Sequence, residues 1–401
     1  MSVGTAPAEK RHAPPHWRED GLVGCEPATR QADAFGHLPR APRYYSLDAW
    51  RGAACLAVVL YHSSLYYLSN ATVDDFSTRV LRIFAYGWLG VPVFFVISGY
   101  CISATADNSR RRSRAISDYF VRRFRRIYPP YWVFILLAVL IVAAVDVLMM
   151  PRLLSSQPWP QLRPWWFSPS QWFGNLTLTE SWRHHVFGSQ RAHFVGQSWT
   201  LCYEEQFYAV VGLLLWLSAQ RFFLAALLGT LAVGVAQYAA HLSNVDVSGF
   251  FFDGSWLMFA AGILVYFHVN YAKPATRVAT YLALLGGILI CALSQFPMIR
   301  GGGFAFAFAM LLLFLHPWDA QIKRIKWFAP LIICGTMCYS LYLVHELVVR
   351  VVQRGLWASG LTSGAETLLV IVPLCTAASL AAGWGFYVLV ERRFLNPRLA
   401  T

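Results

Sequence analysis

The sequence has little charge for its size and shows none of the cysteine patterns that organise small secreted domains. Only 13% of its 401 residues are Asp, Glu, Lys or Arg, where a soluble globular protein has about 25%. In contrast, 57% of the residues are hydrophobic and 16% are aromatic, which is more apolar surface than one aqueous domain can hide from water. This composition excludes an ordinary soluble enzyme and indicates a polytopic membrane protein.

The sequence also shows no signal peptide, no disulfide framework and no internal repeat. The eight cysteines include no C-x-x-C pair and lie mostly inside apolar runs, so they indicate small buried or lipid-facing residues. The N-terminal residues are rich in Pro, Ala, Arg and His and lack an apolar run. We predict a disordered cytoplasmic tail over 1–43, one transmembrane domain over 44–394 and a short cytoplasmic tail over 395–401.

Apolar stretches of about 20 residues predict an all-α bundle of about ten transmembrane helices. With the N-terminus in the cytoplasm, 24 of the 33 Lys and Arg residues lie in cytoplasmic segments, as the positive-inside rule requires. We therefore expect an even number of spans, a multi-pass protein of the cell inner membrane, and both termini in the cytoplasm. The predicted spans are 46–68, 84–104, 128–150, 200–218, 221–241, 250–268, 277–296, 302–316, 328–350 and 367–390.

The formal charge of +13 would suggest a nucleic-acid partner in a soluble protein. In a membrane protein, basic cytoplasmic segments face anionic lipid instead. We therefore expect the lipid bilayer, and no nucleic acid, as a partner. The oligomeric state stays open.

Ionisable residues inside the predicted spans are candidate site residues, because each one costs a few kcal/mol on insertion scales. Arg51 and His62 are eleven residues apart, which leaves them about 20° apart around a helix and ~16 Å apart along it. They therefore share one face of the first span. The alternative is that Arg51 reaches the cytoplasmic interface while His62 only satisfies a neighbouring helix.

The fourth and ninth spans carry further polar residues. Glu204 and Glu205 are adjacent and point about 100° apart on a helix, so at most one faces a given cavity squarely; the alternative is a cap in headgroup water. Tyr342 and His345 are three residues apart and share a face. The predicted directions bring His62, Glu204 and His345 to a similar depth, which favours a common cavity.

Two connections stand out between the spans. Segment 105–127 holds eight arginines, among them Arg122, Arg123, Arg125 and Arg126, and guanidinium groups suit bidentate contact with phosphates; ordinary positive-inside charge is the alternative. Segment 151–199 is the longest external loop and holds six tryptophans, of which Trp199 is the last. Interface anchoring explains such residues as well as sugar stacking does.

A third cluster, of histidines, lies in the same external loop. His184, His185 and His193 could be metal ligands. Nothing with ligand spacing lies near them in the sequence except aromatic residues and arginines. We therefore expect no metal.

Several motifs, in order, resemble acyltransferase family 3, the integral-membrane acyltransferases that modify hydroxyls of cell-surface sugars. The resemblance covers about 44–394. Thr200 stands where the family more often has Ser, and Pro92 stands where it often has an acidic residue. The motifs are LDAWRGAA at 47–54 followed by His62, GVPVFFVISGY at 90–100, RFRRIYP at 123–129, SWTLCYEEQFY at 198–208 and SLYLVH at 340–345.

The resemblance implies a membrane-embedded O-acyltransferase with no bound cofactor. It would move an acyl group, most often acetyl, from cytoplasmic acyl-CoA to a hydroxyl of a sugar or glycan acceptor outside. Many members carry an additional esterase-like domain after the last span; this sequence ends at Thr401, so we expect all the chemistry in the membrane unit. The competing hypothesis is a transporter or flippase that uses the intramembrane His, Arg and Glu as a proton relay.

Roles follow from this chemistry. Acyl transfer to an alcohol needs a base near neutral pH, and we assign it to His62; a covalent acyl-His62 intermediate stays open. Arg123, Arg126, Arg122 and Arg125 would bind CoA phosphates, and the family suggests that Arg51 contacts the donor or supports His62. Glu204 would hold the imidazole or bind the acceptor, and His345 would stabilise the oxyanion or orient the sugar. Glu205, Tyr342 and Trp199 complete the expected acceptor site.

Overall fold

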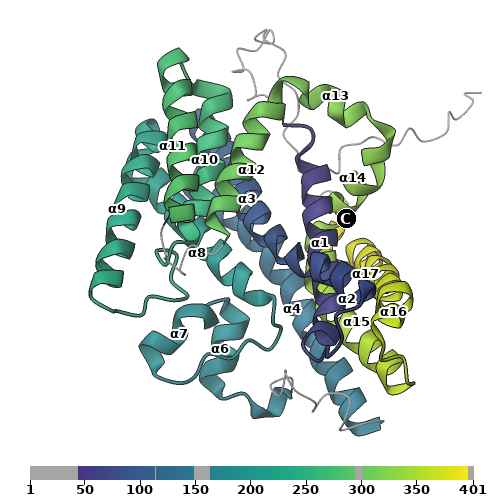
Figure 1. The fold of residues 1–401 in the computed structure, drawn as a ribbon. Helices are drawn as coiled ribbons and strands as arrows, with labels where there is room; N and C mark the ends of the chain where they lie inside the picture. Colours follow the sequence, from purple (N-terminus) through teal and green to yellow (C-terminus); the bar gives the residue numbers. More distant parts are fainter. Residues whose placement is uncertain (1–43, 113, 149–162, 294–300, 396–401) are drawn as a thin grey trace, which may run out of the picture.

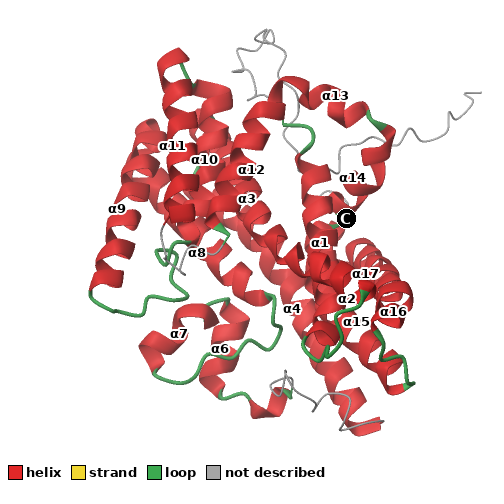
Figure 2. Ribbon diagram, in the orientation of Figure 1, coloured by secondary structure: helices red, strands yellow, loops and turns green. Residues whose placement is uncertain are grey.

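The computed structural model describes residues 44–112, 114–148, 163–293 and 301–395, and over these residues it is all-helical (Figure 2). The predicted fold class is confirmed. The predicted tails, 1–43 and all but the first residue of 395–401, lie outside the described residues.

The helices form one bundle with small elements at both ends (Figure 1). Helices α6 and α7 lie at one end, and α13 lies at the other. The helices are α1 Leu47–Leu68, α2 Phe76–Phe84, α3 Gly90–Arg111, α4 Ile116–Leu148, α6 Pro169–Thr177, α7 Glu180–Phe187, α8 Ser198–Ser218, α9 Phe222–Leu242, α10 Ser255–Tyr271, α11 Pro274–Leu293, α12 Gly302–Leu315, α13 Asp319–Arg324, α14 Ala329–Thr336, α15 Cys338–Ala358, α16 Gly364–Glu366, α17 Val372–Phe386 and α18 Arg392–Leu395.

Each of the ten predicted spans overlaps a helix or a helix pair, the ninth being α14 and α15 together, which meet at a bend of 76°. By length and apolarity alone, six helical stretches of the described chain can cross a membrane, or seven with the bent pair. One of the six, Ser198–Leu242, has 45 residues. At 1.5 Å per residue it would be ~68 Å long, more than twice the hydrocarbon thickness of about 30 Å, so α8 and α9 are two spans joined by a turn.

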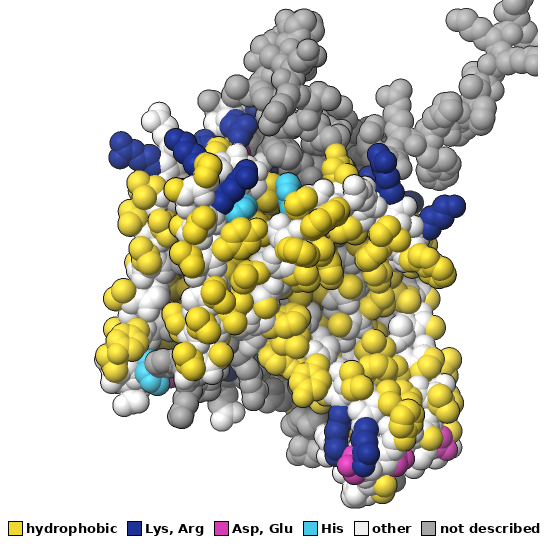
Figure 3. All heavy atoms as spheres, turned by 45° about the horizontal axis from the view of Figure 1, so that its top comes forward, with side chains coloured by type: hydrophobic (Ala, Val, Ile, Leu, Met, Phe, Trp, Pro, Cys, Tyr) yellow, Lys and Arg dark blue, Asp and Glu magenta, His cyan; other side chains and the backbone are white. Residues whose placement is uncertain are grey.

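Hydrophobic side chains cover most of the face seen in Figure 3, with Lys and Arg side chains along its upper edge and a few more at its lower end. On the outer helix α9, Leu224, Leu228 and Val235 are all about half exposed or more. Such a surface needs lipid around it. The protein is therefore a multi-pass membrane protein.

Glycines allow α1 to pack closely against α14, and α3 against α10. A Cβ atom on Gly52 of α1 would lie 1.9 Å from the Leu331 carbonyl oxygen of α14, and one on Gly262 of α10 would lie 1.9 Å from the Val96 carbonyl oxygen of α3. Small residues commonly allow such backbone contacts between membrane helices. These contacts fix α1 and α3, which carry Arg51, His62 and Ser98.

We predict that Gly262→Ala destabilises the protein by about 1–3 kcal/mol, because the added methyl group forces α10 away from α3. Gly229→Ala on α9 is the matched control, since no atom lies within 4 Å of its added Cβ. Thermal unfolding in detergent measures both variants. Equal midpoints for the two variants would contradict the predicted close packing.

Candidate functional site

His62 and His345 lie side by side across two helices. Their ring centroids are 5.2 Å apart, with the ring planes inclined by 58°. His62 comes from the second half of α1, and His345 from the first half of α15, which packs against α1. His345 is 1% exposed, and His62 is half-buried. The structure thus brings together two residues that are 283 positions apart in the sequence.

The hydrogen bonds of His345 define its tautomer. Its Nδ1 lies 2.7 Å from the Tyr342 carbonyl oxygen and 3.2 Å from that of Leu341. Carbonyl oxygens only accept, so Nδ1 carries the proton and, in the neutral ring, Nε2 has the lone pair. Nε2 is buried and makes no hydrogen bond within the described chain. The site therefore contains a fixed, unused hydrogen-bond acceptor next to His62.

The segment that leads into α8 is held against α15 by several hydrogen bonds. The Gln197 side chain donates to the Leu343 carbonyl oxygen at 2.6 Å, and the Gln197 backbone N–H donates to Glu346 Oε2 at 2.9 Å. The Tyr342 hydroxyl bonds both the Gln197 carbonyl oxygen and the Thr200 hydroxyl. Tyr342 is therefore occupied in joining α15 to α8.

Glu346 interacts electrostatically with both His62 and His345. It forms a buried ion pair with Arg350, one turn along α15, and the two side chains are 5% and 12% exposed. His62 interacts electrostatically with both Glu346 and Arg350. A hollow lined by apolar side chains such as Phe134 and Val195 adjoins this ion pair.

Glu204 and Glu205 point in different directions, as their spacing predicts. Glu204 Oε1 accepts hydrogen bonds from the Ser98 hydroxyl of α3 at 2.6 Å and from the Tyr208 hydroxyl one turn along α8. Glu204 also interacts electrostatically with Tyr342. Glu205 contacts the Tyr128 hydroxyl at 3.4 Å, and its Oε1 is buried with no partner among the described residues.

The four arginines at the start of α4 divide into two faces. Arg122 and Arg125 are exposed, whereas Arg123 and Arg126, three residues apart on the same face, are half-buried. Arg123 donates to the Thr105 hydroxyl at 2.7 Å and lies over the Tyr208 ring at 5.0 Å. The inner pair therefore faces the bundle, which the spacing alone does not reveal.

Arg51 lies on the same side of the bundle as Arg123. It forms an ion pair with Asp48 at 2.7 Å and donates to the Cys101 sulfur of α3 at 2.9 Å. Arg123 interacts electrostatically with the same Cys101. Two guanidinium groups, from α1 and α4, thus converge on one stretch of α3.

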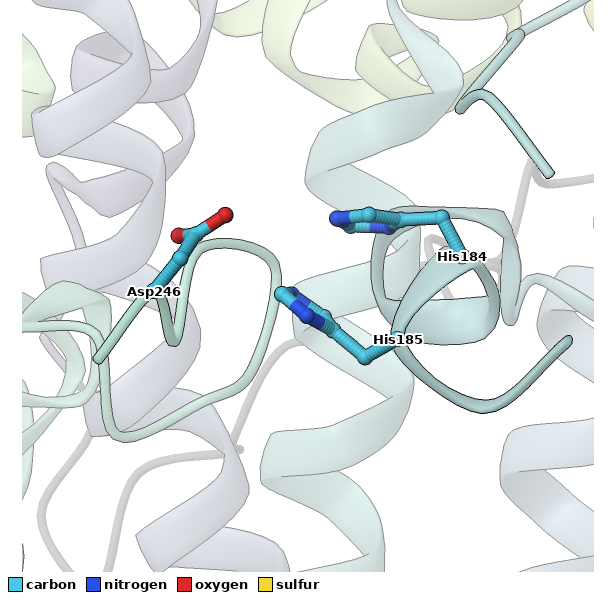
Figure 4. Close-up of side chains that lie close together, drawn as sticks. All are labelled: His184, His185 and Asp246. Carbon is cyan, nitrogen blue, oxygen red and sulfur yellow. The ribbon is translucent and has the colours of Figure 1, made fainter. Parts of the chain in front are cut away.

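Trp199 and the loop histidines lie toward the end of the bundle where α6 and α7 are found. Trp199 is 39% exposed, with its ring edge-on to Phe95. His193 contacts the Ser198 hydroxyl at 3.3 Å, and burial, with Arg191 nearby, lowers the pKa of His193 to about 4. His184 and His185 lie together, and Asp246 is the third member of their group (Figure 4).

Sequence reasoning missed Gln197, Glu346 and Arg350. Glu346 directly follows a candidate histidine in an apolar span, and Arg350 follows it at the i,i+4 spacing of a helical ion pair. That pattern could have identified the pair. Nothing in the sequence connects Gln197 to a helix 149 residues away.

Comparison with known proteins gives a family and distant relatives. The acyltransferase domain of acyltransferase family 3 matches residues 44–388. The peptidoglycan O-acetyltransferase OatA of Listeria monocytogenes is 23% identical over 359 residues, which cover 81% of this chain and 53% of that protein. The O-acetyltransferase OatA of Staphylococcus aureus is 22% identical over 336 residues, with 77% and 51% covered.

A third relative, the acyltransferase MdmB of Streptomyces mycarofaciens, is 30% identical over 171 residues, which cover 42% of this chain and 38% of that protein. The chain spans about half the length of the two OatA proteins. No solved structure matches it.

We predict that Glu346→Ala destabilises the protein by about 3 kcal/mol, since it leaves Arg350 without its partner and the Gln197 N–H without its acceptor. Glu346→Gln keeps an oxygen for Gln197 and is expected to lose less. Thermal unfolding in detergent ranks wild type, Gln and Ala variants in that order. An Ala variant as stable as wild type would show that the contact contributes nothing to stability.

Proposed function

Since the chain belongs to acyltransferase family 3, we propose that it transfers an acyl group, acetyl in the simplest case, from acyl-CoA to a hydroxyl of a sugar or glycan. The family makes the chain an acyltransferase, which replaces the transporter hypothesis of the sequence analysis. Two relatives are named O-acetyltransferases, which supports an oxygen acceptor. The observation that carries the proposed mechanism is the pairing of His62 with His345 inside the bundle.

The donor enters from the arginine-rich end of the bundle. Arg123 and Arg126 face inward from α4, and Arg51 reaches the same stretch of α3. Guanidinium groups bind phosphates with two hydrogen bonds each, so this end suits the nucleotide part of CoA. Because CoA is made in the cytoplasm, this end is the cytoplasmic one in our proposal, in agreement with the distribution of Lys and Arg.

The flexible arm of CoA then extends along α1 and brings the thioester at its end to His62. Arg51 and His62 are eleven residues apart on this helix, which corresponds to ~16 Å along its axis. The acceptor hydroxyl approaches from the opposite end, where Trp199 lies exposed. The two substrates meet at the histidine pair.

His62 acts as the general base in this mechanism. The hydroxyl oxygen of the acceptor attacks the thioester carbonyl carbon, a C–O bond forms and the C–S bond breaks. The hydroxyl proton moves to the imidazole of His62 and from there to the thiolate of the departing CoA. The carboxylate of Glu346 stabilises the positive charge that His62 carries between these steps.

In this mechanism His345 orients the acceptor and does not stabilise the oxyanion. Its Nδ1–H is occupied by backbone carbonyl oxygens, and Nε2 presents a lone pair. A lone pair cannot donate to an oxyanion, but it accepts a hydrogen bond from a sugar hydroxyl. Glu204 and Glu205 provide carboxylates on the acceptor side, while Tyr342, which bonds Thr200 and Gln197, positions α8 against α15.

We predict that His62→Ala lowers acyl transfer by about 100-fold or more, the usual loss when a general base is removed. The measurement is free CoA released by purified protein from acetyl-CoA, with and without an added glycan acceptor. His241→Ala, an exposed residue at the end of α9, is the control and should keep wild-type activity. Near wild-type transfer by the His62 variant would remove this assignment.

We predict that the double variant Arg123→Gln, Arg126→Gln weakens binding of a CoA analogue by about tenfold or more, because each lost charge-assisted hydrogen bond contributes roughly 1.5–3 kcal/mol. The matched control is Arg122→Gln with Arg125→Gln, which removes the same charge from the exposed face of the same helix. Titration of each purified variant gives the affinities. An equal loss in both double variants would show that general positive charge, rather than the inner face, binds the donor.

A further inference from the structure

Two histidines and one carboxylate converge at the end of the bundle that carries α6 and α7. His184 and His185 lie in the last turn of α7, and Asp246 belongs to the connection between α9 and α10. One ligand atom from each residue lies within 4.8 Å of the other two. In Figure 4 the carboxylate of Asp246 points toward the two imidazole rings.

The two segments that carry these residues are fixed to each other. The Ser181 hydroxyl of α7 donates to the Gly249 carbonyl oxygen at 3.0 Å, and the Gln206 side chain of α8 donates to the same oxygen at 3.0 Å. A Cβ on Gly249, whose φ is +93°, would lie 1.9 Å from the Ser181 carbonyl oxygen. The positions of the three side chains therefore rest on a close backbone contact.

Both imidazoles have a nitrogen available for a metal. His185 Nε2 lies 2.8 Å from the Ser248 carbonyl oxygen, which can only accept, so Nε2 carries the proton and Nδ1 has the lone pair. Metal-binding histidines usually donate their second N–H to a carbonyl or carboxylate in this way. His184 Nδ1 is buried and makes no hydrogen bond within the described chain.

The local charges also suit a cation. The Ser248 N–H donates to the Asp246 carboxylate at 2.9 Å and holds it near the two imidazoles. The neighbouring Arg183 is paired with Glu180 at 2.6 Å, and both are fully buried. Arg191 and Arg183 both act electrostatically on His184, and Glu180 compensates the charge of Arg183.

We propose that His184, His185 and Asp246 bind a zinc-type divalent ion. Two imidazole nitrogens and one carboxylate oxygen form a common ligand set for Zn²⁺, which leaves a fourth position for water or a ligand. The ion would link α7 to the α9–α10 connection beside the start of α8. This proposal does not depend on the proposed acyl transfer.

The test uses the full chain in detergent, purified without a polyhistidine tag, incubated with Zn²⁺ and freed of excess metal by gel filtration. Elemental analysis should find one more Zn²⁺ per chain in wild type than in His184→Ala/His185→Ala, and Asp246→Asn should bind Zn²⁺ about tenfold or more weakly. His241→Ala is the control and should match wild type. Added Zn²⁺ should raise the unfolding temperature of wild type but not that of the double variant.

Equal Zn²⁺ content in wild type and the double variant overturns the proposal, because the metal is then bound elsewhere, for instance by the free cysteines. Wild type that retains no Zn²⁺ overturns it as well. A Co²⁺-loaded sample provides the second measurement. The visible spectrum of bound Co²⁺ should lack thiolate charge-transfer absorption. This spectrum should be absent from the double variant. If the double variant does not fold, the spectrum should instead be absent from Asp246→Asn.

Discussion

A polar group in the hydrocarbon region has to find its partner inside the protein, and this constraint shapes the site. The described part of α15 illustrates it: Ser340 bonds Glu391, Tyr342 bonds Thr200, and Glu346 bonds Arg350 and Gln197. Against this background of satisfied groups, the buried Nε2 of His345 has no partner among the residues that the structure describes. An unsatisfied buried acceptor costs free energy, so a hydroxyl that donated to it would gain binding energy, which is what the proposed role of His345 requires.

The same constraint explains why α1 can carry charge. Arg51 is compensated by Asp48 within the helix and by Cys101 of α3, and the approach of Gly52 to α14 keeps α1 inside the bundle. Between Arg51 and His62 the buried residues are apolar or small, such as Cys55, Val58 and Val59. Titratable side chains are therefore present at two levels of one helix, with an apolar stretch of about three turns between them.

Periodicity and composition predicted the helices well, because an apolar run of span length can satisfy its backbone only as a helix in lipid. They also put His62 and His345 at a similar depth, and the two rings lie 5.2 Å apart in the structure; their common cavity stays a prediction. They could not predict the partner of Glu346 or the convergence of His184 with Asp246, because those contacts depend on how helices rotate and on where loops fold back. The direction of Arg123 relative to Arg122 depends in the same way on the buried face of α4.

Tyr208 connects Arg123 of α4 with Glu204 of α8. The guanidinium of Arg123 lies over its ring, and its hydroxyl donates to Glu204, which also accepts from Ser98. One tyrosine thus contacts the cation that we assign to the donor and the carboxylate that we assign to the acceptor. Since α4, α8 and α3 all contribute to this chain of contacts, the positions of Arg123 and Glu204 both depend on the packing of one tyrosine.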